Sequence, residues 1–268
     1  MGLEVEFAVK FATDSNILEL SKTLLHTFKD SRLFDYLVRI EVRKDEYIAY
    51  LKPDLRLEKI VNIDQAEQIM LDYCQQCDQE KIMIVLWWSA KRYGKSKIGG
   101  IVESPNRAII NIVGKDFYFP SAHNNQANLV YEVGDAKDYT WYIYGDEVAS
   151  KNLEELLKEI RLIADAGALS IKCVDMESSG DPRRNYLCFH RHLDSYIEDI
   201  KSFYPIADIE SISEDDLLNA VLQSEDIDFV EAEAGLVIYH KKFVTANLTQ
   251  FYEKLALIVS ADHNGKQN

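Results

Sequence analysis

Residues 81–90 constrain the fold more than any other part of this chain. Their sequence, KIMIVLWWSA, contains a run of seven apolar residues from Ile82 to Trp88. Such a run is too short to cross a bilayer, which takes about 20 residues in a helix. A short apolar run with no polar face is typical of a strand buried on both sides. We therefore expect residues 81–90 to form a central strand of a sheet.

The first half of the chain mixes strand and helix patterns around this run. Residues 3–11 alternate apolar and polar side chains, which predicts a strand with one buried face. Apolar residues recur at helical spacing over residues 17–28, and again after Asn62, a residue type that caps helices. Further strands are predicted at 38–42, 47–51, 107–113 and 116–119, with a loop at 120–126.

The second half continues in the same mixed manner. Strands are predicted at 139–144 and 168–174, a helix from a Ser150 cap to Gly167, further helices over 193–204, from Ser213 and over 245–259, and a hairpin around Gly235. Strands and helices do not alternate strictly, so we expect an α+β fold. With a weak break at 134–138, this predicts two mixed domains, 1–134 with a strand meander and an acidic 139–268, each a mostly antiparallel sheet packed with helices.

Acidic residues are concentrated in one segment. Residues 1–134 have 17 basic and 19 acidic residues, a charge of −2, whereas the remainder has 13 and 26, a charge of −13, which together give −15. Unpaired like charges oppose folding unless a positive partner neutralises them, although acidic surfaces also confer solubility. Residues 208–233 contain ten acids and no Lys or Arg: Asp208, Glu210, Glu214, Asp215, Asp216, Glu225, Asp226, Asp228, Glu231 and Glu233.

This charge makes nucleic acid an unlikely partner, because phosphate binding needs clustered basic residues. The start of the chain has Glu4 and Glu6 where a signal peptide would be basic, and four cysteines are too few to crosslink 268 residues. We therefore expect a cytoplasmic protein with reduced cysteines and no membrane partner. Cys74 and Cys77 have metal-ligand spacing, but a structural zinc site needs four ligands, so helix packing is the preferred interpretation.

Common catalytic motifs are absent from the sequence. No dinucleotide-binding glycine fingerprint, Gly-x-Ser-x-Gly elbow or His-Glu-x-x-His is present. The densest set of groups able to transfer protons or bind ligands lies at 183–194, and consists of Arg183, Arg184, His190, His192 and Asp194. It would form an anion site or active site if the side chains converge, and a solvated helix start with ordinary salt bridges otherwise. No catalytic residue, metal or cofactor is assigned from the sequence.

A small basic loop, 91–97, follows Trp87 and Trp88 and carries four basic residues. Basic residues beside aromatics are typical of single-stranded nucleic-acid binding, but a solvated hairpin is the simpler interpretation. At least one of the two tryptophans is expected to belong to the core.

The leading hypothesis is a non-enzymatic cytoplasmic binding protein that neutralises a basic protein, such as a toxin. Its acidic, aromatic-rich and motif-poor character is similar to that of bacterial immunity proteins and antitoxins. The acids would steer association, and Tyr239, Tyr142 or Tyr144 would be anchors. The alternatives are an enzyme acting on an anionic small molecule through the 183–194 cluster, and an oligomer subunit. The oligomeric state is left open.

Overall fold

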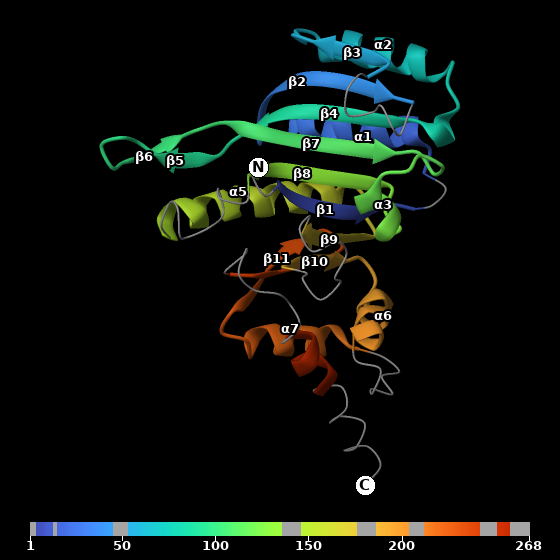
Figure 1. Ribbon diagram of the computed structural model, residues 1–268. Helices are drawn as coiled ribbons and strands as arrows, with labels where there is room; N and C mark the ends of the chain where they lie inside the picture. The colour runs from blue at the N-terminus through green and yellow to red at the C-terminus, as the bar shows by residue number, and fades with distance from the viewer. Residues whose placement is uncertain are drawn as a thin grey trace.

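Strands from both halves of the chain form one large antiparallel sheet (Figure 1). The computed structural model describes residues 4–12, 15–44, 53–135, 146–175, 186–203, 212–241 and 251–257. Within these ranges the sheet has ten strands, and a separate pair, β5 and β6, forms a hairpin. The strands are β1 (Glu4–Lys10), β2 (Phe34–Arg43), β3 (Leu55–Glu58), β4 (Met83–Ala90), β5 (Tyr93–Lys95), β6 (Ile101–Glu103), β7 (Asn106–Val113), β8 (Leu129–Asp135), β9 (Ser170–Asp175), β10 (Leu187–His190), β11 (Ile227–Ala232) and β12 (Gly235–His240).

Helices connect these strands and cover the sheet. They are α1 (Ile17–Asp30), α2 (Ile63–Cys74), the short 3-10 helix η1 (Gln79–Lys81), α3 (Pro120–Asn124), α5 (Asp146–Asp165), α6 (Leu193–Phe203) and α7 (Glu214–Leu222), and residues 251–257 are also helical. The mixed α+β class with a mostly antiparallel sheet is therefore confirmed.

The sheet runs without a break through the expected domain boundary. Its strand order is β11-β12-β10-β9-β1-β8-β7-β4-β2-β3, and each neighbouring pair is antiparallel. Strand β1 lies in the middle, where Val5 pairs with Val133 of β8 on one side and Asp175 of β9 on the other. The division into domains 1–134 and 139–268 is not confirmed, because β1 joins strands from both.

Strand β4 is central, as its two apolar faces predict. It lies between β2 and β7, and alternate residues Leu86 and Trp88 enter the main core. That core also contains the inward faces of α1, α2 and α5, so these helices cover one face of the sheet. On the other face Val85 belongs to a smaller cluster with Phe117 and Phe119. Burial on both faces explains why the strand is apolar from Met83 to Trp88.

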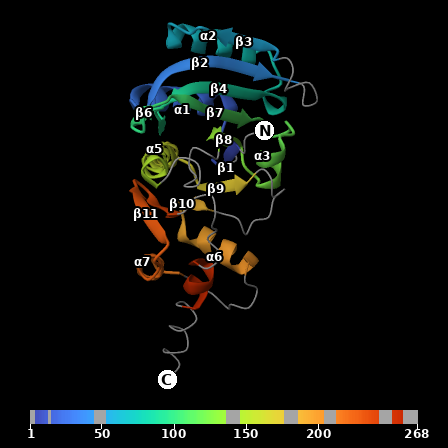
Figure 2. The ribbon, with the colours of Figure 1, turned by 60° about the vertical axis from the view of Figure 1, so that its left-hand side comes forward.

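A separate set of helices packs on the end of the sheet formed by β10, β11 and β12. Helices α6 and α7 and residues 251–257 enclose a second core there, which includes Cys188, Tyr196 and Ile238 (Figures 1 and 2). The hairpin predicted around Gly235 is formed by β11 and β12, with Gly235 at a φ of +145°. A side chain is disfavoured at this φ, so the turn needs glycine.

The structure differs from three local predictions. Residues 116–119 are not a strand, because the backbone N–H groups of Gly114 and Asp116 bond to the carbonyls of Ile82 and Glu80 instead of a strand neighbour. The loop predicted at 120–126 contains α3, and Ser150 is not a helix cap because α5 begins four residues earlier, at Asp146. The strands predicted at 47–51 and 139–144 lie outside the described residues.

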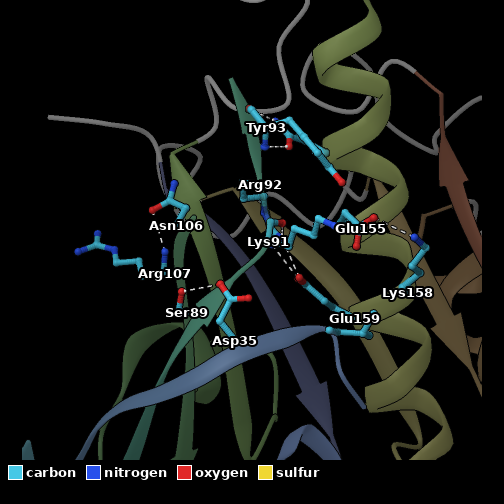
Figure 3. A network of polar contacts seen from close by, with 12 residues as sticks. Asp35, Ser89, Lys91, Arg92, Tyr93, Asn106, Arg107, Glu155, Lys158 and Glu159 are labelled. Carbon is cyan, nitrogen blue, oxygen red and sulfur yellow. Dashed lines mark hydrogen bonds and ion pairs between the residues drawn. The ribbon is translucent and has the colours of Figure 1, made fainter. Parts of the chain in front are cut away.

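A buried ion pair fastens α5 to the sheet (Figure 3). The Arg92 guanidinium, just after β4, donates to both carboxylate oxygens of Glu159 at 2.6 and 2.7 Å. Both side chains are only 1% exposed, and the Tyr131 hydroxyl on β8 donates to the same carboxylate at 2.7 Å. Because both charges are paired and hydrogen-bonded, this arrangement offsets the cost of removing them from water.

A side-chain amide extends the same junction. Asn152 of α5 accepts from the backbone N–H of Tyr93 at 2.7 Å and donates to its carbonyl at 3.1 Å. The amide therefore satisfies both backbone groups of one residue of β5, as a neighbouring strand would. Asn152 is itself buried, so α5 meets the sheet and the base of the β5–β6 hairpin through directional bonds as well as apolar contact.

We expect Glu159→Leu to lower the free energy of unfolding by about 3–5 kcal/mol, because it removes the carboxylate that neutralises the buried Arg92 charge. The double variant Arg92→Met/Glu159→Leu should recover part of this loss, since it removes both buried charges of the pair. Urea denaturation measures both.

The matched control is Lys158→Met, which breaks the more exposed Lys158–Glu155 pair on the same helix (Figure 3). Its expected cost is below about 1 kcal/mol. Equal losses for Glu159→Leu and Lys158→Met would contradict the importance of the buried pair.

Candidate functional site

The acidic segment lies at one end of the molecule, on α7, the loop after it and β11 (Figure 1). Strand β11 is an edge of the ten-stranded sheet and pairs only with β12 among the described strands. Asp208 and Glu210 fall outside the described residues. The structure brings the other eight acids to this end: Glu214, Asp215, Asp216, Glu225, Asp226, Asp228, Glu231 and Glu233.

Three of these acids occupy the first turn of α7. Ser213 and Asp216 form a reciprocal capping box, in which each side chain accepts from the backbone N–H of the other residue. Glu214 and Asp215 are exposed beside it. Negative charge at a helix start is stabilised by the helix dipole. Asp216 therefore has a structural role, and Asp215 and Glu214 are available to a partner.

The remaining acids follow α7 and line the edge strand. Asp228 pairs across the ladder with Tyr239, which is half-buried and packs against the main core. Burial, reinforced by the negative charge of Asp228, raises the pKa of Tyr239 to about 12. Tyr239 thus remains a neutral phenol next to the acids, while Tyr142 and Tyr144 lie outside the described residues.

No basic side chain of the described residues forms an ion pair with these acids. Glu214, Asp215, Glu225, Asp226, Asp228, Glu231 and Glu233 each have no Lys, Arg or His nitrogen within 4.0 Å in that part of the chain. The ammonium groups of two nearby lysines, Lys241 and Lys254, instead donate to backbone carbonyls at 3.3 Å. The negative charge at this end is therefore only diffusely compensated.

The second candidate, the cluster at 183–194, is not drawn together in the described residues. His190 is buried beneath α6, whereas His192 and Asp194 are exposed at the start of that helix. Arg183 and Arg184 lie outside the described residues. No shared pocket therefore joins His190 to His192 and Asp194.

His190 instead forms a buried network with two residues that the sequence did not single out. Its Nε2 lies 2.8 Å from Oδ2 of Asp199 on α6, and the Lys172 ammonium on β9 donates to Oδ1 at 2.5 Å. Lys172 alternates with apolar neighbours along a strand, a pattern that predicts a solvent-facing side chain. Helix α6 covers that face of the strand instead. The sequence offered one indication of this network, because Asp199 lies between Ile197 and Ile200, which are both buried.

The electrostatics of this network favour a neutral imidazole. Burial lowers the pKa of His190, although the Asp199 carboxylate acts in the opposite direction. Burial alone would raise the pKa of Asp199, but the hydrogen bond from His190 and the charge of Lys172 hold it below its usual value. Nδ1 of His190 is buried with no hydrogen-bond partner, so a proton placed there would lack an acceptor. This geometry suits a structural link between α6 and the sheet.

The buried thiols of Cys188 and Cys74 are not activated as nucleophiles. Burial raises the pKa of the Cys188 thiol to about 12, and that of Cys74 to about 12 as well. All four cysteines are free thiols. Cys74 lies on the buried face of α2, which fits the helix-packing interpretation of the Cys74–Cys77 spacing.

The basic loop at 91–97 is divided between the core and a projecting hairpin. Arg92 is buried in its pair with Glu159, and Trp88 is in the main core, so the expected burial of one tryptophan is confirmed. Lys91 lies 3.6 Å from Glu103. The exposed basic residues that remain, Lys95 and Lys97, sit on the β5–β6 hairpin, which extends beyond the sheet (Figure 1). They form no continuous basic stripe of the kind that follows a nucleic-acid backbone.

Comparison with known proteins gives no relative: no family model, no curated protein and no solved structure matches this chain. Among the described residues, no group of three or more His, Cys, Asp or Glu side chains is arranged to hold a metal ion. No helix in those ranges combines the length and apolarity needed to cross a membrane.

The His190 network predicts a pH dependence of stability. Because the folded-state pKa of His190 is lowered, its stabilising contribution is fully present above about pH 6.5 and falls as the pH drops through the folded pKa. One group contributes a slope of at most about 1.4 kcal/mol per pH unit. We expect His190→Gln to flatten this part of the curve of unfolding free energy against pH.

The exposed His192 provides the control, since His192→Gln should leave the slope as in the parent protein. A slope unchanged by His190→Gln would show that this histidine is not the group that titrates.

Proposed function

We propose that the protein is a non-enzymatic, cytoplasmic binding protein that neutralises a basic protein partner, in the manner of bacterial immunity proteins and antitoxins. The observation that supports this most directly is the convergence of acids on α7, the following loop and the edge strand β11, with no ion-pair partner among the described residues. A binding role requires no catalytic motif, in keeping with the sequence.

An edge strand adds a directional component to this surface. The outer backbone N–H and C=O groups of β11 have no strand neighbour among the described residues. A partner segment in extended conformation is able to pair with such an edge, and its side chains then determine specificity. The exposed Glu231 on this strand favours a partner segment that carries Lys or Arg.

The basic residues at the other end of the sheet do not neutralise these acids. Strands β11 and β2 are separated by eight strand spacings, which amount to roughly 40 Å at about 4.8 Å each. Charges are screened beyond about 8 Å at physiological ionic strength. The acidic end therefore presents its own negative field, which accelerates the approach of a basic protein.

The enzyme alternative has no comparable support at 183–194. The buried His190 contacts Asp199, which also pairs with Lys172, and the exposed His192 and Asp194 do not face it. The described residues of the 183–194 cluster therefore form neither a pocket nor a nucleophile paired with a base.

The proposal is tested by reversing three acids that have no structural bond. We expect the triple variant Asp215→Lys/Asp226→Lys/Glu231→Lys to lose a basic protein that co-purifies with the tagged parent protein from its native cells in near-equal amount. Asp216 is left unchanged, because it caps α7. With that partner purified, surface plasmon resonance should show a slower association rate and a weaker dependence on salt.

A control variant with the same change in charge is Asp30→Lys/Asp72→Lys/Asp116→Lys, whose three acids are exposed on α1, on α2 and in the loop before α3. It should retain the partner. Recovery of no basic protein with the parent chain, or equal recovery with both triple variants, would refute the proposal.

A further inference from the structure

A polar cavity lies on the sheet face opposite α1 and α2, at the end remote from the acidic edge. It has a volume of about 320 Å³ and is lined by outward-facing residues of β2, β3, β4, β7 and β8. Pockets for small molecules span roughly 300–1,000 Å³, so a small ligand fits this volume. Phe119, just before α3, forms part of its wall. None of the residues in the acidic segment or the 183–194 cluster lines it.

Three arginines of this cavity share one buried carboxylate. Glu41 on β2 is 3% exposed and lies 3.2 Å from Arg39 Nε, 2.5 Å from Arg43 Nη2 and 3.5 Å from Arg56 Nε. Arg39 and Arg43 are themselves mostly covered, with 17% and 12% of their side chains exposed. Glu58 at the rim contacts Arg56 at 2.8 Å and Arg39 at 3.8 Å. Arg107 and Glu132 also line the cavity, so its lining holds four guanidinium groups and the two carboxylates of Glu41 and Glu132, with Glu58 beside Arg56.

The indole of Trp87 also lines the cavity. Arg39 lies over its ring, 3.9 Å from the centroid, and Arg107 lies 5.8 Å from it. The Nε1–H of Trp87 is buried with no hydrogen-bond acceptor. The amide nitrogen of Asn111, which also lines the cavity, donates to Glu132 and to the Val130 carbonyl.

Donors therefore outnumber acceptors in this cavity. Each guanidinium has five N–H donors and accepts nothing, and the indole only donates. An unsatisfied buried donor is costly, so the complementary ligand is one that brings acceptors and negative charge. We propose that this cavity binds a small oxyanion, a phosphate or carboxylate group of a small molecule, through Arg39, Arg43 and Arg56 with Trp87 beside it.

The chemistry of the lining selects this ligand class over two others. A metal cation is disfavoured because Glu41, the most buried carboxylate, is already surrounded by guanidinium groups. A nucleic-acid strand needs basic residues spread along a groove, whereas these are confined to a single cavity. Guanidinium groups form paired hydrogen bonds with both carboxylate and phosphate, so the two oxyanions are separated by experiment.

The test follows the indole N–H signal of Trp87 in two-dimensional nitrogen–proton NMR spectra, assigned with Trp87→Phe. We expect this signal to shift and saturate on titration with inorganic phosphate or with citrate, and not with sodium chloride at matched ionic strength. The stronger of the two titrations identifies the preferred oxyanion.

Arg56→Gln is the informative variant, because Arg56 is half exposed and its loss leaves Glu41 paired with Arg39 and Arg43. It should weaken oxyanion binding by roughly tenfold or more. Arg161→Gln, on the exposed side of α5, removes the same charge and should bind as the parent protein does. Unchanged nitrogen–proton spectra elsewhere show that each variant is folded.

An equal shift with chloride, or equal affinity in the Arg56→Gln and Arg161→Gln variants, would mean an adventitious ion only and would overturn the proposal. Absence of any shift of the Trp87 signal with phosphate and citrate would overturn it as well. Neither result bears on the acidic edge, since no residue reversed there lines this cavity.

Discussion

The buried pair between Arg92 and Glu159 is the contact on which the arrangement of the two halves depends. One partner follows the central strand β4 and the other belongs to α5, so the pair joins chain from either side of the expected domain boundary. Since each charge is costly to bury alone, α5 has to dock where Glu159 meets Arg92 and the Tyr131 hydroxyl. With α5 docked there, the chain returns to the sheet and forms β9 beside β1. The sheet therefore continues through both halves.

The continuous sheet separates two surfaces of opposite character. At one edge, β11 and α7 present acids with no described ion-pair partner, and near the other edge β2 and β3 hold arginines around one carboxylate. Because screening removes their influence on one another, the electrostatic fields of the two surfaces are independent. Under the two proposals above, a basic macromolecule and a small anion would bind without competing.

Local elements were largely predictable from the sequence, because hydrophobic period and caps are local signals. The central strand at 81–90, helix α1, the Ser213 cap and the hairpin at Gly235 all follow from neighbouring residues. The burial of polar residues was not predictable, because it depends on what covers them. Lys172 and the alternating Arg39, Glu41 and Arg43 follow a solvent-face pattern, but Lys172 meets Asp199 of α6 and Glu41 meets Arg56 of β3. The alternation of Val38, Ile40 and Val42 predicts that all three are buried. Val38 is exposed, because the strand register is irregular between Leu37 and Arg39.

The place of β1 in the sheet has a consequence for synthesis of the chain. Phe7 leaves the ribosome well before its ladder partners, Tyr131 and Cys173. Neither edge of β1 has its neighbour until much of the chain has been translated, and pairings between such distant segments form slowly. Until then the nascent chain carries an apolar strand with two open edges, a species prone to aggregate, so a chaperone that shields the N-terminal segment would favour correct folding.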